Sequence, residues 1–284
     1  MIQTTIETIT PELAKEYLRH NGHNRRIRPS YVETLVRDIK AGKFTLTHQG
    51  IGFRENGELF DGQHRLLAIA MAGIPVQMMV SRDVPDEAVL ATDRGQTRTV
   101  CDVIRISDQE SVAGPLRSSK IVSALSQLVR CNYKYMRLSA SDVMELYNAF
   151  PETVTAVYES VARHSTLKGI TAPMLAAAIA AVDNGVDKTV VEKFFRVFGK
   201  DDLSGCENMN VQAALNWKRQ IDAAKIRHMS IDRKNIYLGT QQAIRNFSST
   251  GRPSTISVPD EPIYDMSGKL SAVLDKNVTS AAIA

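Results

Sequence analysis

The stretch that decides the fold reads Asp61-Gly62-Gln63-His64-Arg65-Leu66-Leu67-Ala68. It stands where the apolar pattern of a strand changes into that of a helix, and its glycine lets the backbone come close to a ligand. The first N–H groups of a helix lack internal partners, and the helix dipole favours negative charge at that end. The stretch therefore predicts an anion-binding turn that suits a phosphate group.

The residues next to this turn predict a hairpin, a helix and a buried strand. Asn56-Gly57 is a strong two-residue hairpin signal between short strands at 49–53 and 58–60. Residues 64–72 carry a helical apolar pattern, and residues 76–80 carry that of a buried strand. The local order is strand, turn, helix, strand, which is typical of a mixed α/β unit.

Further strand and helix signals precede the hairpin. β-branched residues over 2–9 predict a strand, and Thr10-Pro11 combines a capping residue with a proline suited to the first helical position. Ser30 and Glu33 form a capping box that predicts the start of a second helix.

Beyond about residue 106 the apolar spacing becomes helical throughout. Predicted helices cover 116–129, 141–150, 151–162, 171–182, 189–198, 211–227 and 232–247, with Ser139 or Ser141 and Thr171 as caps. The predicted fold class is α+β: a mixed α/β domain over 1–106, an all-helical domain over 107–247, and a tail over 248–284. Small and polar residues prevail in that tail and predict a flexible or partner-ordered segment.

Length and composition narrow the class of protein. With 284 residues and 43% apolar content the chain can bury two cores. Its longest nearly uncharged apolar run, 172–182, is about half of what a membrane-spanning helix needs, so we expect no membrane partner and a cytoplasmic location. The cysteines Cys101, Cys131 and Cys206 are odd in number and far apart, which favours reduced structural thiols over disulfides or zinc.

Positive charge gathers in one segment near the end of the helical domain. Residues 216–252 hold eight lysines and arginines against two aspartates, an excess of six in a chain whose net charge is +4. A solvated helix face and a nucleic-acid contact explain this equally well. The candidate nucleic-acid-binding residues are Lys218, Arg219, Lys225, Arg227, Arg233 and Lys234.

The spacing of several short motifs resembles the ParB/sulfiredoxin superfamily, and more narrowly the DGQHR-bearing, ParB-like proteins of phages and mobile elements. The motifs are Asn24-Arg25-Arg26-Ile27-Arg28, Gly42-Lys43-Phe44, Gly50-Ile51-Gly52-Phe53, Asp61-Gly62-Gln63-His64-Arg65 and Ala72-Gly73. The resemblance covers roughly residues 5–105. A weaker match over 241–247 resembles the helical companion domain of those phage proteins.

This resemblance implies a ParB/sulfiredoxin-like domain whose turn holds the phosphates of a nucleoside triphosphate, CTP in ParB proteins and ATP in sulfiredoxins and ParB-like serine kinases. Arg65 would supply a planar fork for phosphate oxygens, His64 a donor, and Gly62 and Gln63 backbone N–H groups. Arg94 or Arg98 would close the other side, although the spacing is one residue longer than in the corresponding ParB motif. Gln63 replaces the sulfiredoxin cysteine, which argues against that chemistry.

Several residues have two interpretations. Asp61 either holds Mg²⁺ beside the triphosphate or closes the turn. His64 has a functional interpretation, in which it contacts phosphate or transfers a proton, and a structural one, in which it bonds a backbone group. We favour the functional interpretation. For Arg25, Arg26 and Arg28, outward solvated charge is favoured over phosphate contact. His48, Glu58 and Asp93 are weaker candidates.

Three functions follow from these interpretations. The leading one is a ParB-like protein of phage or mobile-element type that binds a nucleoside triphosphate and acts on or with nucleic acid, with DNA as the candidate partner. The second is a phosphotransferase or nucleotide hydrolase with Asp61 and His64 as its candidate catalytic residues. The third is an interaction module without catalysis. The chain lacks the Walker, GxGxxG, HExxH and GxSxG patterns, and the nucleotide base and any homo-oligomer stay open.

Overall fold

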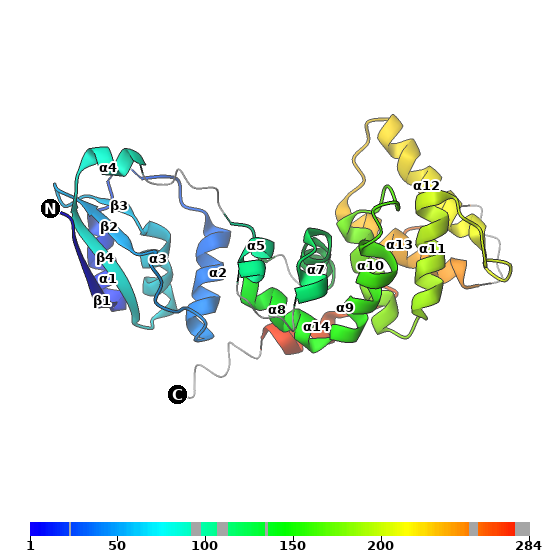
Figure 1. The fold of residues 1–284 in the computed structure, drawn as a ribbon, viewed down its shortest axis with the longest axis horizontal. Coiled ribbons are helices and arrows are strands. Elements are labelled where there is room, and N and C mark those ends of the chain that lie inside the picture. Colours follow the sequence, from blue (N-terminus) through cyan, green and yellow to red (C-terminus); the bar gives the residue numbers. More distant parts are fainter. Residues whose placement is uncertain (23, 92–97, 107–112, 134–135, 250–254, 276–284) are drawn as a thin grey trace. The chain divides into compact units, whose positions relative to one another are not determined.

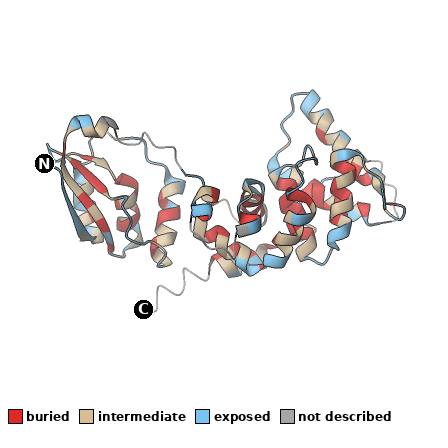
Figure 2. Cartoon of the chain, viewed as in Figure 1, coloured by how far each residue is buried: buried red, intermediate tan, exposed pale blue. Residues whose placement is uncertain are grey.

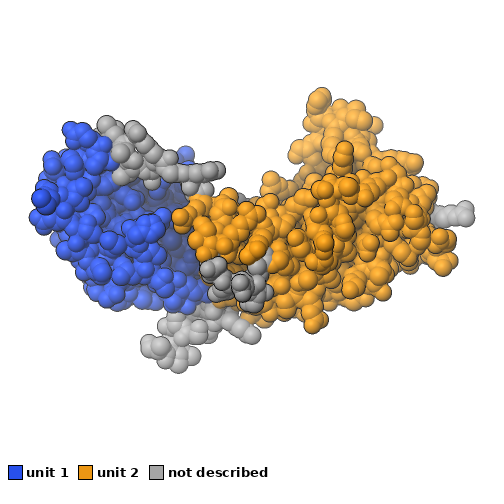
Figure 3. Space-filling model, viewed as in Figure 1, with its two compact units in different colours: residues 1–97, 275–284 blue, residues 98–274 orange. Residues whose placement is uncertain are grey.

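The structure is a computed structural model that describes the chain except residues 23, 92–97, 107–112, 134–135, 250–254 and 276–284. The fold is mixed α+β, about 58% helical, with one small mixed sheet. The chain divides into two compact units, residues 1–97 and residues 98–274 (Figure 3). Each unit has its own hydrophobic core of buried residues (Figure 2).

The first unit is a four-stranded sheet covered by helices (Figure 1). Its elements are β1 (Gln3–Ile9), α1 (Pro11–Arg19), α2 (Pro29–Lys40), β2 (Ile51–Arg54), β3 (Leu59–Asp61), α3 (Gln63–Ala72), β4 (Val76–Val84) and α4 (Asp86–Ala91). The strand order is β1-β4-β2-β3, and the β2–β4 pair is parallel whereas the other two pairs are antiparallel. Both α1 and α2 pack against α3. The predicted hairpin is confirmed by the β2–β3 pairing.

Strand β4 is longer than the predicted strand over 76–80. It continues to Val84, and its last part pairs with the start of β1, where Gln3 lies opposite Arg82. The Arg82 guanidinium also forms an ion pair with Glu7 of β1. This pairing of polar residues across two strands extends β4 beyond its apolar run.

The predicted capping box at the start of α2 is wrong. The helix begins at Pro29, with Arg28 as its N-cap residue, so Ser30 is already the second residue of the helix. Proline suits the first helical position because its φ angle is preset. The backbone N–H of Arg28 instead donates to Nε2 of His64, at 3.0 Å. A contact from another element therefore sets where this helix begins.

The described residues of the second unit form helices joined by turns and loops, with no strand among them. Its elements are α5 (Val100–Ile106), α6 (Ala113–Leu116), α7 (Ser119–Asn132), α8 (Ala140–Ala149), α9 (Pro151–Val157), a π-helical turn (Tyr158–Ala162), α10 (Ala172–Asp183), α11 (Lys188–Lys200), α12 (Val211–Ile226), α13 (Arg233–Phe247) and α14 (Ser267–Leu274). Helix α10 is buried over 173–181 and packs against α7, α9, α11 and α13. Within the described part of the chain, no helix has both the length and the apolar character to cross a membrane.

The structure differs from the predicted flexible tail over residues 255–274. This segment ends in α14, and Ile256, Met266 and Leu270 are buried in the core of the second unit. The side chain of Gln241 is fully buried and accepts hydrogen bonds from the N–H groups of Ile263 and Tyr264, at 2.8 and 3.0 Å. Because these bonds to α13 satisfy the backbone, the segment needs no regular apolar period of its own.

The three thiols occupy apolar surroundings. Cys101 and Cys206 are buried, and Cys131 is half-buried. Burial raises the pKa of the Cys131 thiol to about 11, which keeps it protonated at neutral pH.

Candidate anion-binding site

The turn before α3 requires its glycine. β3 ends at Asp61, Gly62 has a φ of 102° in the left-handed region, and α3 begins at Gln63. A Cβ at position 62 would also lie 3.1 Å from Cγ1 of Ile51. Only glycine adopts this conformation without strain, so a strand passes directly into a helix here, as the sequence predicts.

Asp61 and Arg65 bracket this turn. Oδ1 of Asp61 accepts the N–H of Gly62 at 2.7 Å, and Oδ2 accepts Nη2 of Arg65 at 2.9 Å. Nη2 of Arg65 also donates to the carbonyl of Gly50 at 2.5 Å, while its buried Nε has no hydrogen-bond partner among the described residues. The carboxylate therefore serves as an internal anion at the start of the helix, which is the turn-closing arrangement expected of an aspartate before glycine.

Gln63 and His64 point into the protein and bind the backbone of residues 25 and 28. Both side chains are more than nine-tenths buried, at 3% and 4% exposure. Nε2 of Gln63 donates to the carbonyl of Arg25 at 2.6 Å, and Nε2 of His64 accepts the N–H of Arg28 at 3.0 Å. The His64 ring also makes an edge-to-face contact with Tyr31. The structure thus shows His64 satisfying a backbone group.

The electrostatics around His64 are strongly positive. Burial lowers the pKa of His64, and the nearby guanidinium groups of Arg25, Arg28 and Arg65 lower it further. The carboxylate of Asp61 acts in the opposite direction but does not offset them, so the imidazole is neutral at pH 7. Arg25 and Arg28 are exposed on a backbone that is held in place. Their sequence pattern predicts solvated charge, because it does not show that Gln63 and His64 bind the backbone of these two arginines.

The other residues predicted for this site include some that lie outside the described part of the chain and one that belongs to the second unit. Arg94 and Asp93 lie outside the described residues, and Arg98 is an exposed residue of the second unit. His48 is exposed and Glu58 is half-buried in the first unit. Within the described residues, no group of three or more His, Cys, Asp or Glu side chains is placed to hold a metal ion.

The predicted nucleic-acid-binding residues fall into two groups. Lys218 pairs with Asp201, and Lys225 pairs with Asp222, each at 3.0 Å. The exposed side chains of Arg227, Arg233 and Lys234 gather instead at the connection between α12 and α13. Arg219 is exposed on α12 and donates to Asn216. Unneutralised positive charge is therefore concentrated at one end of these helices.

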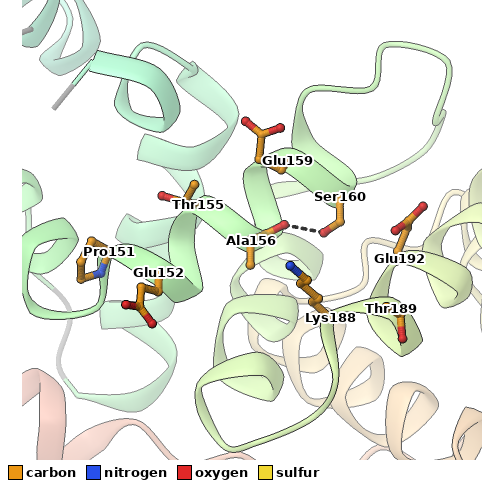
Figure 4. Close-up of a pocket in the computed structure, with 9 residues that line it drawn as sticks. All are labelled: Pro151, Glu152, Thr155, Ala156, Glu159, Ser160, Lys188, Thr189 and Glu192. Carbon is orange, nitrogen blue, oxygen red and sulfur yellow. Dashed lines mark hydrogen bonds between the residues drawn. The ribbon is translucent and has the colours of Figure 1, made fainter. Parts of the chain in front are cut away.

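A cavity of about 500 Å³ lies in the second unit between α9, the π-helical turn and the start of α11 (Figure 4). Three carboxylates, Glu152, Glu159 and Glu192, face it with one ammonium group, Lys188. The sign of this charge opposes a phosphate ligand.

A smaller cavity of about 220 Å³ lies in the first unit beside Tyr17, Phe53 and Arg82. The Arg82 guanidinium is already bound to Glu7 and to the Tyr17 hydroxyl. Among the described residues, the lining of neither cavity includes the Asp61–Arg65 turn.

No protein-family model, curated protein or solved structure matches this chain. Its function is therefore inferred from its own residues and their geometry.

The neutral His64 makes the stability of the first unit depend on pH. In the unfolded chain the imidazole has a pKa near 6.5, and in the folded unit its pKa is lower. The unfolded state therefore binds more protons below about pH 6.5, so the free energy of unfolding falls as the pH drops through this range.

Hydrogen exchange of α3 and β2 amides between pH 8 and pH 5, corrected for intrinsic exchange rates, measures how steeply the free energy of unfolding depends on pH. We expect His64→Gln to flatten this dependence and the exposed His48→Gln to leave it unchanged; an unchanged slope in His64→Gln contradicts the assignment.

Proposed function

We propose that the first unit is a ParB-like domain that binds a nucleoside triphosphate, and that the protein, of phage or mobile-element type, acts on or with nucleic acid. One observation carries the nucleotide half: Arg25, Arg28 and Arg65 gather around a neutral His64 at the glycine turn that opens α3. Guanidinium groups and helix N-termini are the preferred protein partners of phosphate oxygens. Three guanidinium groups near one helix start suit a polyanion such as a triphosphate.

The constrained backbone of residues 25–28 supports this proposal. Gln63 and His64 hold that backbone with two hydrogen bonds, so Arg25 and Arg28 extend from a constrained segment into solvent. Binding a phosphate group then requires ordering of two side chains but no rearrangement of a loop. The buried polar residues of the motif thus have a positioning role, and the exposed arginines have the binding role.

Asp61 has a defined place in this proposal. Its carboxylate occupies the donors that an incoming phosphate would use, the Gly62 N–H and Arg65. A phosphate oxygen that replaces it at these donors frees the carboxylate for the Mg²⁺ that accompanies a triphosphate. Asp61 would then bind metal together with the nucleotide, which agrees with the absence, among the described residues, of a cluster of three or more side chains that could hold a metal ion alone.

The nucleic-acid half of the proposal is supported by the exposed cations at the connection between α12 and α13. Arg227, Arg233 and Lys234 are exposed, whereas Lys218 and Lys225 have carboxylate partners. Phosphate contacts of this kind position a protein on nucleic acid without reading its sequence.

Arg28→Ala tests the nucleotide site. Titration calorimetry with ATP, CTP, GTP and UTP, with and without Mg²⁺, should show binding to the parent chain and a loss of about 10-fold in affinity in Arg28→Ala, the size of one charge-assisted hydrogen bond. Phosphate release in the same mixtures distinguishes binding from turnover.

The matched control is Arg19→Ala, which removes an exposed arginine of α1 in the same unit and should bind like the parent chain. In the nucleotide-free state, the pKa of His64 measured by NMR should rise in Arg28→Ala because one positive neighbour is gone. Absence of binding to all four nucleotides, or equal affinity in parent and Arg28→Ala, refutes the proposed site.

A further inference from the structure

The connection between α12 and α13, residues 226–232, exposes two large apolar side chains. We call this connection the α12–α13 tip. Ile226 and Met229 are 79% and 63% exposed, whereas most large apolar residues of the second unit are buried. At the top of Figure 1 the end of α12 stands clear of the other helices of this unit. Single exposed apolar residues are common on protein surfaces, so the significance of these two depends on the backbone that carries them and on the charges around them.

The backbone of the tip is held in a defined shape. The N–H of Met229 donates to the carbonyl of Ala224, and the N–H of His228 donates to that of Lys225. With His228 at a φ of 53°, this is the Schellman ending of a helix, in which glycine usually takes the left-handed position. In that motif the next apolar residue commonly packs back on the helix, but Met229 remains exposed.

The far side of the tip is also fixed. Asp232 caps α13 by accepting the N–H of Lys234 at 3.0 Å, and Ile231 packs against the core of the unit. Ile226 and Met229 are therefore presented on a constrained turn. A strained residue that maintains an exposed apolar group is typical of a functional surface.

Positive charge surrounds this apolar pair. Arg227, Arg233 and Lys234 are exposed beside it, and Asp232, the acidic residue among them, is engaged as a helix cap. A partner that matches this pattern carries anions on its outside and apolar surface just behind them. Duplex DNA offers this arrangement where a base step is unstacked, since phosphates flank the groove and the faces of the opened base pairs are apolar.

The geometry of the tip favours DNA over an anionic membrane. Helices that lie on membranes place a whole apolar face in the lipid. The apolar faces of α12 and α13 are buried in the protein core, through Trp217, Ile221, Tyr237 and Ile244 among others. Proteins that bend DNA insert one or two apolar side chains between base pairs, and the two side chains on this turn match that number.

We propose that the α12–α13 tip binds duplex DNA in the minor groove, where Ile226 and Met229 wedge between base pairs and bend the duplex while Arg227, Arg233 and Lys234 contact phosphates. The proposal rests on the nucleic-acid half of the proposed function. It adds the kind of nucleic acid, the groove, and a deformation that the cations alone would not produce.

Energy transfer between dyes on the two ends of a 25-base-pair duplex tests the wedge, with affinity measured across a salt series. The parent chain should bind and shorten the distance between the ends. Ile226→Ala/Met229→Ala should abolish the shortening and weaken binding about 10-fold without changing the salt dependence. Arg227→Ala/Arg233→Ala should reduce the slope of log affinity against log salt by about 2. Leu203→Ala, at a 52% exposed position of the same unit, should behave like the parent.

The outcomes separate this proposal from the one on which it rests. If the parent chain does not bind duplex or single-stranded DNA even at low salt, the nucleic-acid half of the proposed function is wrong, and the wedge with it. If binding is salt-dependent but Ile226→Ala/Met229→Ala bends the duplex like the parent, the wedge is wrong and DNA binding stands. Sedimentation with phosphatidylglycerol vesicles that is lost in the same double variant, without bending of DNA, overturns the wedge in favour of a membrane contact.

Discussion

Replacing Gly50 by alanine is expected to lower the free energy of unfolding of the first unit by about 3 kcal/mol, the upper range for overpacking. A Cβ at this position would lie 2.1 Å from the carbonyl oxygen of Met79 and 2.8 Å from its carbonyl carbon. Because these are backbone atoms of β4, no change of rotamer relieves the clash. The parallel pairing of β2 with β4 must shift instead. Chemical denaturation monitored by hydrogen exchange in β4 measures the loss.

Gly57→Ala is the matched control for this prediction. Gly57 has a φ of +82°, and no described atom lies within 4 Å of where its Cβ would be. Its replacement carries only the conformational cost of a left-handed alanine, about 1 kcal/mol. Equal losses in the two variants would show that the close approach of Gly50 to β4 is not what requires glycine. Since the Gly50 carbonyl accepts from Arg65, nucleotide affinity should also decrease in Gly50→Ala.

Replacing Trp217 by alanine is expected to lower the free energy of unfolding of the second unit by about 4 kcal/mol, as for other large aromatic residues in cores. The indole is buried, and its Nε1 donates to Oγ1 of Thr240 at 3.0 Å. Gly239 faces the same ring, because a Cβ there would lie 2.3 Å from Cη2 of Trp217. Urea denaturation followed by far-UV circular dichroism measures the loss, since the substitution removes the only tryptophan.

Combining the Trp217 and Gly239 substitutions tests this packing directly. Gly239→Ala should destabilise the parent chain because its methyl group meets the indole. In the Trp217→Ala background the same change has space, and alanine is favoured over glycine inside a helix by about 1 kcal/mol. The sign of the Gly239→Ala effect should therefore reverse. Additive effects of the two substitutions would contradict the close contact between the ring and α13.

Features encoded by neighbouring residues could be predicted from the sequence. The hairpin at Asn56-Gly57 and the turn at Gly62 each depend on a glycine in the left-handed region, which is a local requirement. Ser139 caps α8 together with Asp142, three residues later, as its spacing indicates. In each of these cases the deciding interaction spans at most a few residues, so the pattern of residues contains it.

Features set by distant residues could not be predicted. The start of α2 depends on His64, which is 36 residues from its partner Arg28. The fold of residues 255–274 depends on Gln241. The spacing of apolar residues does not show which backbone groups the amide of Gln241 will bind. Both features rest on hydrogen bonds between a buried side chain and a backbone group far away in the sequence. Local sequence patterns do not indicate such bonds.

The candidate site shows the same division between local and distant information. The motif from Asp61 to Arg65 identifies the turn, but it does not show which side chains face solvent. The structure buries Gln63 and His64 and brings the exposed Arg25 and Arg28 to the turn. The residues with the clearest motif thus serve as supports, and residues expected to be solvated charge become the candidate ligand contacts.

The contact of Gln241 with the segment at 263–264 has a consequence for synthesis of the chain. Translation runs from the N-terminus, so α13 leaves the ribosome before the segment that satisfies its glutamine and covers its apolar neighbours. Until residues 255–274 have emerged, the nascent helical unit holds an open groove that Leu270 and Met266 later fill. A nascent chain at this stage offers apolar surface to chaperones and to other nascent chains. The second unit therefore closes when residues 255–274 have left the ribosome, and not when α13 is complete.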